Sequence, residues 1–485
     1  MKKYLSLILL ILFFPTLSWC ACTGGGTSCT GSSPTWTCTD ASEGCISDVI
    51  TAATDGDTIN VTDTVGRTWS SQLPITKNIS LIGPGASLLT ITSSHTAVDS
   101  NVFNYLNYLI SWVPTTAAKT ANTGGNMFRI SGFTFDMNNS CAGIFLNNTS
   151  TDSTKVDHVR IDHNTFIKAY DSASGGGHPW SWRAIDIQGT VYGVADANTF
   201  GSILGATYDN KKDIDVAGRD KNSWDSLTFS FGSADNFYIE NNTFYHADSN
   251  SSCGQGGRYT IRYNTYTYTG AGALSPWLDQ HGNQTGGIFS CMGTEIYNNV
   301  LTSTQNKGVQ IFDWRGGKNL AYNNNVITTG SVTATAIEEL TDECNPTTNV
   351  QPQRLSGSYS WNNTKNTSTA VLATFNDGGA SYNCKTSLGC DYDAKTCTCD
   401  GVYNSNTYAC YYPLTDGVDF FNTQYSYTPY KCPHPLTGLT SGCNSSVAGT
   451  AGYNVGGSIS TGGSISTGGS ATITPGGTGS ITFGN

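Results

Sequence analysis

Residues 277–315 contain the side chains of this chain that are best suited to acid–base chemistry. Asp279 and His281 lie close together, and Asp313 and Arg315 follow further along. Removal of a proton beside the carboxylate of a uronic acid needs a base and a cation that stabilises the developing charge. His281 and Arg315 are the candidates for base and stabiliser, and Asp279 is placed to orient His281. The segment therefore predicts a site for β-elimination.

Carboxylates in the same segment also fit hydrolysis of a glycosidic bond. Hydrolysis needs two carboxyl groups flanking the bond, about 5 to 9 Å apart depending on stereochemistry. Asp279, Glu295 and Asp313 can supply such a pair. A structural interpretation competes with both reactions, because these acids and His281 can also fix a loop or cap a strand end, and Arg315 can pair with an acid at a turn. The sequence leaves these alternatives open.

Five tryptophans lie in or beside the inserted segments described below, and aromatic rings of this kind stack on sugar rings. The alternative is that the loops use them to fasten themselves to the body of the protein. We take them as candidate substrate-binding residues: Trp180, Trp182, Trp224, Trp277 and Trp314.

Residues 205–225 hold the densest charge of the chain, with acidic and basic residues mixed. Such a segment is typical of a solvated loop. Asp213 and Asp215 are nevertheless candidate ligands for calcium, because hard cations prefer several oxygen ligands. No loop of the EF-hand type accompanies them. Calcium is therefore the one cofactor that the sequence suggests.

A short phrase recurs along the chain: a hydrophobic pair, one or two asparagines, then Thr or Val and an apolar or aromatic residue. Its repeat asparagines are separated by 34, 44, 22, 35 and 26 residues, and they are Asn164, Asn198, Asn242, Asn264, Asn299 and Asn325. An interval near 22 residues is typical of one rung of a parallel β-helix, and longer intervals carry insertions. The insertions at residues 205–225 and 270–290 would wall a groove along the solenoid.

The recurring asparagines predict a structural ladder at one corner of the rungs. Asparagine tolerates the left-handed backbone conformation, and its amide can bond to the asparagine above and below. Asp186 and Asp313 lie at the same offset from their asparagines and hence on the same strand face. They are about four rungs apart, roughly 19 Å at the usual strand spacing, which is too far for one catalytic pair.

The start of the chain resembles the pectin-lyase-like right-handed parallel β-helix proteins. Residues 42–54 have apolar residues at helical spacing, and they precede the segments 55–59 (DGDTI) and 79–85 (ISLIGPG). In that superfamily a capping helix leads into such a strand and turn. The resemblance implies an all-β, right-handed parallel β-helix whose N-terminal helix covers an otherwise open strand edge.

Further motifs resemble a group of exported bacterial β-helix proteins of uncertain activity. These motifs are residues 279–282 (DQHG), 295–299 (EIYNN), 315–317 (RGG), 361–364 (WNNT) and 427–436 (YTPYKCPHPL). Members of the wider fold are mostly polysaccharide lyases and glycoside hydrolases, with some tailspikes and adhesins. Fold alone does not choose among these activities.

The N-terminal segment and the cysteine content predict export. Residues 1–20 combine two lysines, an apolar run and small residues, which is typical of a secretory signal peptide. No other apolar run is long enough to span a bilayer.

The chain has 16 cysteines, which favours disulfides in an extracellular protein, either secreted or held at the cell surface. The expected parts are a Cys-rich segment (21–45), the β-helix (46–365), a disulfide-rich C-terminal cap (366–443) and a flexible Gly/Ser/Thr-rich tail (444–485), which is a candidate tether or self-association segment.

The charge content limits the possible partners. Charged residues make up 12% of the chain and the net charge is −11, so no basic stripe is present to neutralise nucleic-acid phosphates. Polysaccharide is the expected partner. The sequence thus favours a secreted carbohydrate-active protein, either a polysaccharide lyase or a glycoside hydrolase. The alternative is a non-enzymatic surface, matrix or glycan-binding protein of the adhesin type.

Overall fold

The computed structural model describes most of the chain but leaves out several inserted segments. The described residues are 18–20, 29–98, 104–148, 154–169, 183–201, 212–218, 228–245, 249–268, 278–282, 289–303, 308–336, 338–339, 355–375, 390–391, 396–397, 411–412 and 414–443. Most of the predicted signal peptide (1–17), the tail (444–485) and much of the predicted groove walls lie outside them. None of the helices in the described part is a candidate membrane span. The chain divides into two units, residues 1–447 and 448–485.

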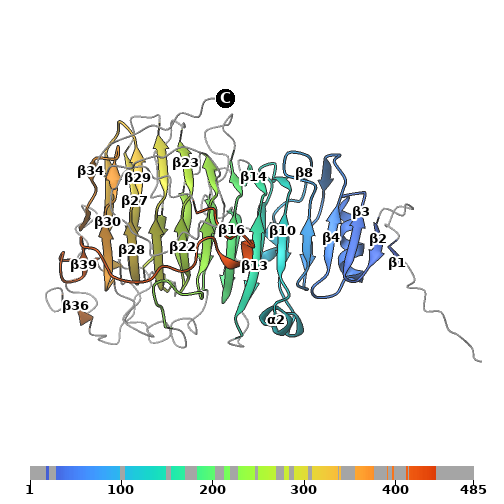
Figure 1. The fold of residues 1–485 in the computed structure, drawn as a ribbon, viewed down its shortest axis with the longest axis horizontal. Helices are drawn as coiled ribbons and strands as arrows, with labels where there is room; N and C mark the ends of the chain where they lie inside the picture. The colour runs from blue at the N-terminus through green and yellow to red at the C-terminus, as the bar shows by residue number, and fades with distance from the viewer. Residues whose placement is uncertain are drawn as a thin grey trace, which may run out of the picture. The chain divides into compact units, whose positions relative to one another are not determined.

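Three long sheets form the first unit, and successive strands of the chain pass from one sheet to the next (Figure 1). Sheet A contains β1 (Ser18–Cys20), β2 (Cys29–Ser32), β3 (Thr35–Cys38), β4 (Thr58–Val61), β7 (Ser80–Ile82), β10 (Phe128–Ser131), β13 (Val156–Asp162), β16 (Val191–Asp196), β19 (Phe237–Glu240), β22 (Arg258–Arg262), β25 (Gly293–Tyr297), β28 (Lys318–Tyr322), β32 (Ser358–Trp361) and β39 (Phe420–Phe421). Strands β1, β2 and β3 pair antiparallel, and every later pair in sheet A is parallel.

The other two sheets, B and C, are likewise built from strands of successive rungs. Sheet B contains β5 (Arg67–Trp69), β8 (Thr90–Ser93), β11 (Thr134–Asp136), β14 (Thr165–Ile167), β17 (Thr199–Phe200), β20 (Thr243–Tyr245), β23 (Thr265–Tyr268), β26 (Val300–Ser303), β29 (Asn325–Ile327), β33 (Thr364–Lys365) and β34 (Thr369–Ala370). Sheet C contains β6 (Leu73–Ile75), β9 (Tyr108–Trp112), β12 (Ala142–Asn148), β15 (Arg183–Gly189), β18 (Lys212–Ala217), β21 (Ser249–Gly254), β24 (Leu278–Gln280), β27 (Val309–Trp314), β30 (Val332–Ala336) and β35 (Ala373–Phe375). Three stacked parallel sheets of this kind confirm the predicted parallel β-helix.

Short elements complete the fold. The predicted N-terminal helix is α1 (Glu43–Ala52), and it buries Cys45, Ile46, Val49 and Ile50. The remaining elements are α2 (Thr116–Thr123), η1 (Tyr105–Asn107), η2 (Pro435–Thr437) and the paired strands β31 (Glu338–Glu339) with β38 (Tyr411–Tyr412) and β36 (Cys390–Asp391) with β37 (Thr396–Cys397). Three disulfides lie within the described residues: Cys29–Cys38, Cys253–Cys291 and Cys432–Cys443.

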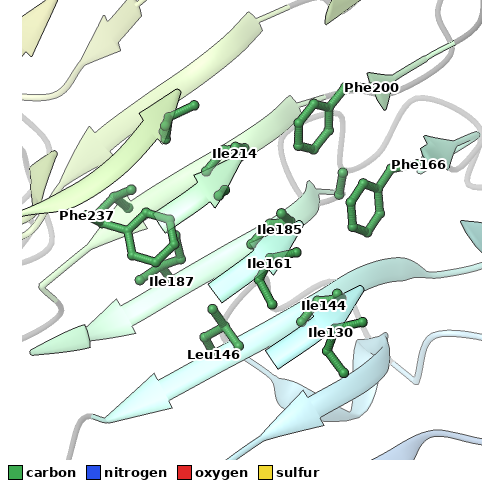
Figure 2. Packing of buried hydrophobic residues seen from close by; sticks show 14 of the residues in the cluster. Ile130, Ile144, Leu146, Ile161, Phe166, Ile185, Ile187, Phe200, Ile214 and Phe237 are labelled. Carbon is green, nitrogen blue, oxygen red and sulfur yellow. The ribbon is translucent and has the colours of Figure 1, made fainter. Parts of the chain in front are cut away.

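The core follows from the alternation of side chains along each strand, because neighbouring residues of a strand point to opposite faces. Figure 2 shows Ile130 and Ile161 from sheet A gathered with Ile144 and Ile185 from sheet C. In sheet B the equivalent inward position is aromatic on successive rungs. The rings of Phe166, Phe200 and Phe244 stack with centroids 5.2 and 4.7 Å apart. Each rung therefore presents its other face for surface contacts.

A ladder of buried asparagines marks the turn from sheet A to sheet B. In each step the backbone N–H and the Nδ2 of one asparagine donate to the Oδ1 of the asparagine in the next rung. The members are Asn164, Asn198, Asn242, Asn264, Asn299, Asn324 and Asn363.

The structure corrects the predicted ladder in two respects. The ladder passes through Asn324 and not through Asn325, because Asn325 already belongs to sheet B, where it pairs with Val300. The left-handed residue is also the one before each ladder asparagine, such as Tyr263 with φ 58° and Asn298 with φ 57°. The ladder asparagine itself turns its side chain inward to bond its neighbours.

After β39 the chain runs back along the outer face of sheet A. We call residues 425–437 the strap; in Figure 1 it is the red segment that crosses sheet A. The hydroxyls of Tyr427 and Tyr322 lie 2.9 Å apart, and the N–H of His434 donates to Glu240 at 2.7 Å. The carbonyl of Thr437 accepts a bond from Arg160 at 3.2 Å. This part of the predicted C-terminal cap therefore lies along the side of the solenoid.

Candidate functional site

Strand register places acidic residues in one column on the outer face of sheet C. Asp186 of β15 is paired with Asp215 of β18, and Asp215 is paired with Ser252 of β21. Ser252 is paired with Asp279 of β24, and Asp279 with Asp313 of β27. Neighbouring strands lie about 4.8 Å apart, so each step of this carboxylate column is one strand spacing. The column places Asp186 and Asp313 on one face, four rungs apart.

The upper half of the column is a cluster of four residues, Asp279, His281, Asp313 and Arg315. The Nη2 of Arg315 donates to Oδ1 of Asp279 and lies 3.2 Å from Nδ1 of His281. The Nε of Arg315 is 3.7 Å from Oδ2 of Asp313, and Nε2 of His281 is 3.3 Å from Oδ2 of Asp279. Arg315 therefore joins the two carboxylates and the imidazole. We call this group the acid–His–Arg cluster.

The acid–His–Arg cluster remains partly open to solvent. The side chain of His281 is 28% exposed, and those of Asp279, Asp313 and Arg315 are each 15% exposed. Thr335 on the next rung donates its hydroxyl to Oδ1 of Asp313 at 2.7 Å. His281 is thus the most accessible proton-exchanging group of the cluster.

Backbone bonds and a disulfide hold His281 in place. Strand β24 ends at Gln280, and the N–H of His281 donates to the carbonyl of Cys253 at 2.7 Å. The carbonyl of His281 accepts from the N–H of Cys291 at 2.9 Å, and Cys253 and Cys291 form a disulfide. Arg315 is fixed by a bond from its Nε to the carbonyl of Gln280 at 2.7 Å. These bonds orient the imidazole toward Arg315.

The lower half of the column is buried. Arg183 lies 2.6 Å from Asp215 through Nη2 and 3.5 Å from Asp186 through Nη1. Asp186 also accepts bonds from the hydroxyl of Tyr108 and the amide of Gln188, each at 2.5 Å. Burial raises the pKa of Asp186 to about 6, with Arg183 opposing the shift and Asp215 adding to it. Because Asp186 is fully buried, a polymer at the surface cannot reach its carboxyl.

Sequence reasoning named Asp186 and Asp215 separately but missed their pairing and their contact with Arg183. The two strands read R-A-I-D-I-Q-G from Arg183 and K-D-I-D-V-A-G from Lys212, and they align residue for residue in sheet C. That repeated I-D-[IV] pattern was the available signal. It pairs Asp186 with Asp215 across an insertion that hides the correspondence.

Of the candidate calcium ligands Asp213 and Asp215, the second lies beside an internal cation. Asp213 is fully buried, and Asp215 is ion-paired with Arg183 at 2.6 Å. Among the described residues no group of three His, Cys, Asp or Glu side chains could hold a metal ion. A calcium ion at these two residues would have to compete with Arg183 for Asp215, and the site stays a prediction.

Glu295 does not join Asp279. It lies on β25 in sheet A, whereas Asp279 lies on β24 in sheet C. Its carboxyl accepts bonds from the N–H of Gly232 at 2.8 Å and from Nδ2 of Asn236 at 3.2 Å. Burial raises the pKa of Glu295 to about 7. Nearness in sequence was misleading because consecutive strands of a rung face different directions.

Trp314 is not positioned to bind a sugar. Its ring is fully buried in the core, where it stacks on Phe312 with centroids 4.0 Å apart. The strand irregularity between Gln310 and Asp313 turns Asp313 outward and Trp314 inward. The other four candidates lie outside the described residues: Trp180, Trp182, Trp224 and Trp277.

Comparisons with known proteins do not assign this chain to a family. No protein-family model and no curated protein matches the chain. Among solved structures, an alginate lyase from Paenibacillus sp. str. FPU-7 is similar with a TM-score of 0.36 and 16% sequence identity, and the match covers 61% of this chain and 97% of that chain. A likeness of this size does not establish a shared activity.

Proposed function

We propose that this protein hydrolyses a polysaccharide at the acid–His–Arg cluster on sheet C. The observation that carries the proposal is that Asp279 and Asp313 occupy neighbouring rungs on one outer face, with His281 beside them. One strand spacing of about 4.8 Å is close to the carboxyl separation of about 5–5.5 Å in glycosidases that retain configuration. In that mechanism one carboxylate attacks the sugar and a second acid protonates the leaving oxygen.

The charge of the cluster favours an uncharged glycan. Two carboxylates, Asp279 and Asp313, share the single guanidinium of Arg315, so the cluster is negative when His281 is neutral. A uronic-acid polymer would bring further carboxylates to this position, and like charges at short range repel. A neutral sugar avoids that repulsion and can accept hydrogen bonds from Arg315.

One contact supports β-elimination as a second candidate. The Nδ1 of His281 lies 3.2 Å from the guanidinium of Arg315. The imidazole of His281 could act as the base that removes the proton. The same guanidinium could stabilise the carboxylate of the substrate during proton removal. A lyase would therefore use the same four residues.

Export is the second part of the proposal. Residues 1–20 would direct secretion, the disulfides would form outside the cytoplasm, and the tail at 444–485 would serve as a tether at the cell surface. Disulfides within the solenoid, such as Cys253–Cys291, are compatible with an extracellular protein. A non-enzymatic glycan-binding protein would share all of these features. Turnover is therefore the decisive property.

The test is a panel of neutral and acidic polysaccharides incubated with the oxidised protein. Reducing ends report any cleavage, and the ultraviolet absorbance of unsaturated uronides reports elimination. We expect D279N and D313N to lose about 100-fold or more of turnover, as expected for removal of an acid or base. A matched control is D136N on sheet B, because Asp136 is 14% exposed and pairs with Lys168 in the same way.

Four outcomes separate the hypotheses. Reducing ends without unsaturated products support hydrolysis, and unsaturated products support elimination. Full activity in D279N and D313N would place the site elsewhere. Absence of cleavage across the panel by a folded protein would support the binding or matrix protein.

A further inference from the structure

Glu295 differs from the other buried carboxylates that the structure describes on the outer face of sheet A. Each of the others pairs with an arginine: Asp162 with Arg129 at 2.6 Å, Asp196 with Arg160 at 2.8 Å and Glu240 with Arg262 at 2.6 Å. Glu295 is equally buried but forms no ion pair with any described residue. A buried carboxylate without a cation is costly, so such a group tends to hold its proton.

The two oxygens of Glu295 have unequal surroundings. Oε1 accepts bonds from the N–H of Gly232 and from Nδ2 of Asn236. Oε2 is buried and has no well-formed hydrogen bond, although the hydroxyl of Tyr427 faces the same carboxyl. A proton on Oε2 would turn that oxygen into a donor toward the strap. Geometry therefore favours the neutral acid.

The strap packs directly over this carboxyl. Gly232 has φ +72°, and a Cβ atom built there would lie 2.1 Å from the carbonyl oxygen of Thr428 in the strap. Tyr427 places its hydroxyl 2.9 Å from that of Tyr322 on β28. Glu295, Gly232 and the strap thus form one close contact, in which no side chain at position 232 could be accommodated.

The neighbouring titratable groups do not change charge near neutral pH. The carboxyl of Glu295 faces Arg262 and the phenols Tyr238, Tyr297, Tyr322 and Tyr427. Burial raises the pKa of all four phenols, and Arg262 stays charged beside Glu240. Further along the strap, burial lowers the pKa of His434 to about 3, so His434 stays neutral.

We propose that Glu295 is a pH-sensitive latch for the strap: the protonated side chain holds residues 425–431 against sheet A, and its ionisation releases them. Ionisation places an uncompensated charge between the strap and sheet A, and hydration of that charge requires the strap to move away. Release would uncover the outer aromatic side chains of sheet A, including Tyr297 and Tyr322. This inference is independent of the proposed catalytic activity.

Trypsin cleavage at Lys431 measures release. The side chain of Lys431 is exposed, but its carbonyl accepts a bond from Nη2 of Arg262 at 2.7 Å, so cleavage requires the strap to leave sheet A. With a pKa of about 7 in the closed state against 4.5 for a free Glu, linkage predicts that opening rises about 30-fold between pH 5.5 and 8.5. Cleavage in the wild type is compared at each pH with E295Q, which corrects for the pH dependence of trypsin.

We expect E295Q to keep the strap closed at every pH, so that the ratio of wild-type to variant cleavage rises with pH. Gly232→Ala serves as a positive control, because its methyl group prevents docking of Thr428 and should give rapid cleavage at every pH. Hydrogen exchange of the strap amides in the wild-type protein provides a second readout that needs no substitution. A wild-type to E295Q ratio that stays constant from pH 5.5 to 8.5, with G232A cleaved rapidly, would overturn the proposal.

Discussion

Substitution of Asn264 by Ala tests how much the asparagine ladder contributes to stability. Oδ1 of Asn264 accepts from the N–H and Nδ2 of Asn242 at 2.9 and 3.1 Å. Its Nδ2 donates to the carbonyls of Ile239 and Arg262 and to Oδ1 of Asn299 at 2.9, 3.1 and 3.0 Å. Alanine removes all five bonds at a position that is almost completely buried.

The expected loss follows from the groups left behind. The N–H of Asn242 would be buried without an acceptor, which costs about 1–3 kcal/mol, and the other lost bonds contribute roughly 1 kcal/mol together or more. We therefore expect N264A to lower the free energy of unfolding by about 2–4 kcal/mol. N325A is the matched control, because the partners of Asn325, Thr364 and Thr367, lie at a surface turn where water can replace it. Its expected loss is about 1 kcal/mol or less.

Urea denaturation followed by far-ultraviolet circular dichroism measures both variants. Solenoids can unfold in segments, so the comparison uses the shift in midpoint at an unchanged slope. Equal losses in N264A and N325A, or a loss below about 1 kcal/mol in N264A, would show that the ladder bonds do not stabilise the rungs as argued.

Two further predictions concern sheet C. Burial raises the pKa of Asp186 from 3.8 to about 6, so its contribution to stability is present below pH 3.8 and is lost as the pH rises through 6. The loss is at most about 3 kcal/mol. Urea midpoints should therefore fall more steeply with pH in the wild type than in D186N, which keeps only the smaller fall caused by Glu295 and other groups. Replacement of Cys253 and Cys291 by Ser opens a link with a sequence separation of 38 residues and should lower stability by about 4 kcal/mol on the chain-entropy estimate. The double substitution should also reduce any turnover, because Cys253 and Cys291 form the backbone bonds that hold His281. Unchanged thermal stability in the double variant would contradict the expected loss of about 4 kcal/mol.

The sequence allowed the fold to be predicted because the rung pattern is local. The phrase around Asn242 and Phe244 combines a turn residue with an inward aromatic ring, and both recur on successive rungs. Among the six predicted ladder asparagines, the wrong residue was chosen only at Asn323, Asn324 and Asn325, where three consecutive asparagines were possible members. There the register of sheet B, which is a long-range property, selects Asn324.

The site was harder to predict because it depends on which sheet each strand joins. Asp279 and His281 share a segment, so their contact could be anticipated from the chain alone. Glu295 comes next in sequence but follows a turn into sheet A, and its carboxyl faces the strap. Conversely, Asp186 and Asp215 are brought together by strand pairing across an insertion. Sequence distance is therefore a poor guide to distance on a solenoid.

The asparagine ladder has a consequence for how such a protein can diversify. Successive ladder members are 34, 44, 22, 35, 25 and 39 residues apart, yet each amide reaches the next at 2.8 to 3.2 Å. The amide contacts thus align each rung with the next, whatever length of chain is inserted between two ladder asparagines. Loops around the carboxylate column can be lengthened, shortened or exchanged while the backbone beneath them stays constant. The rungs of the scaffold and the loops that surround the carboxylate column can therefore change independently of each other.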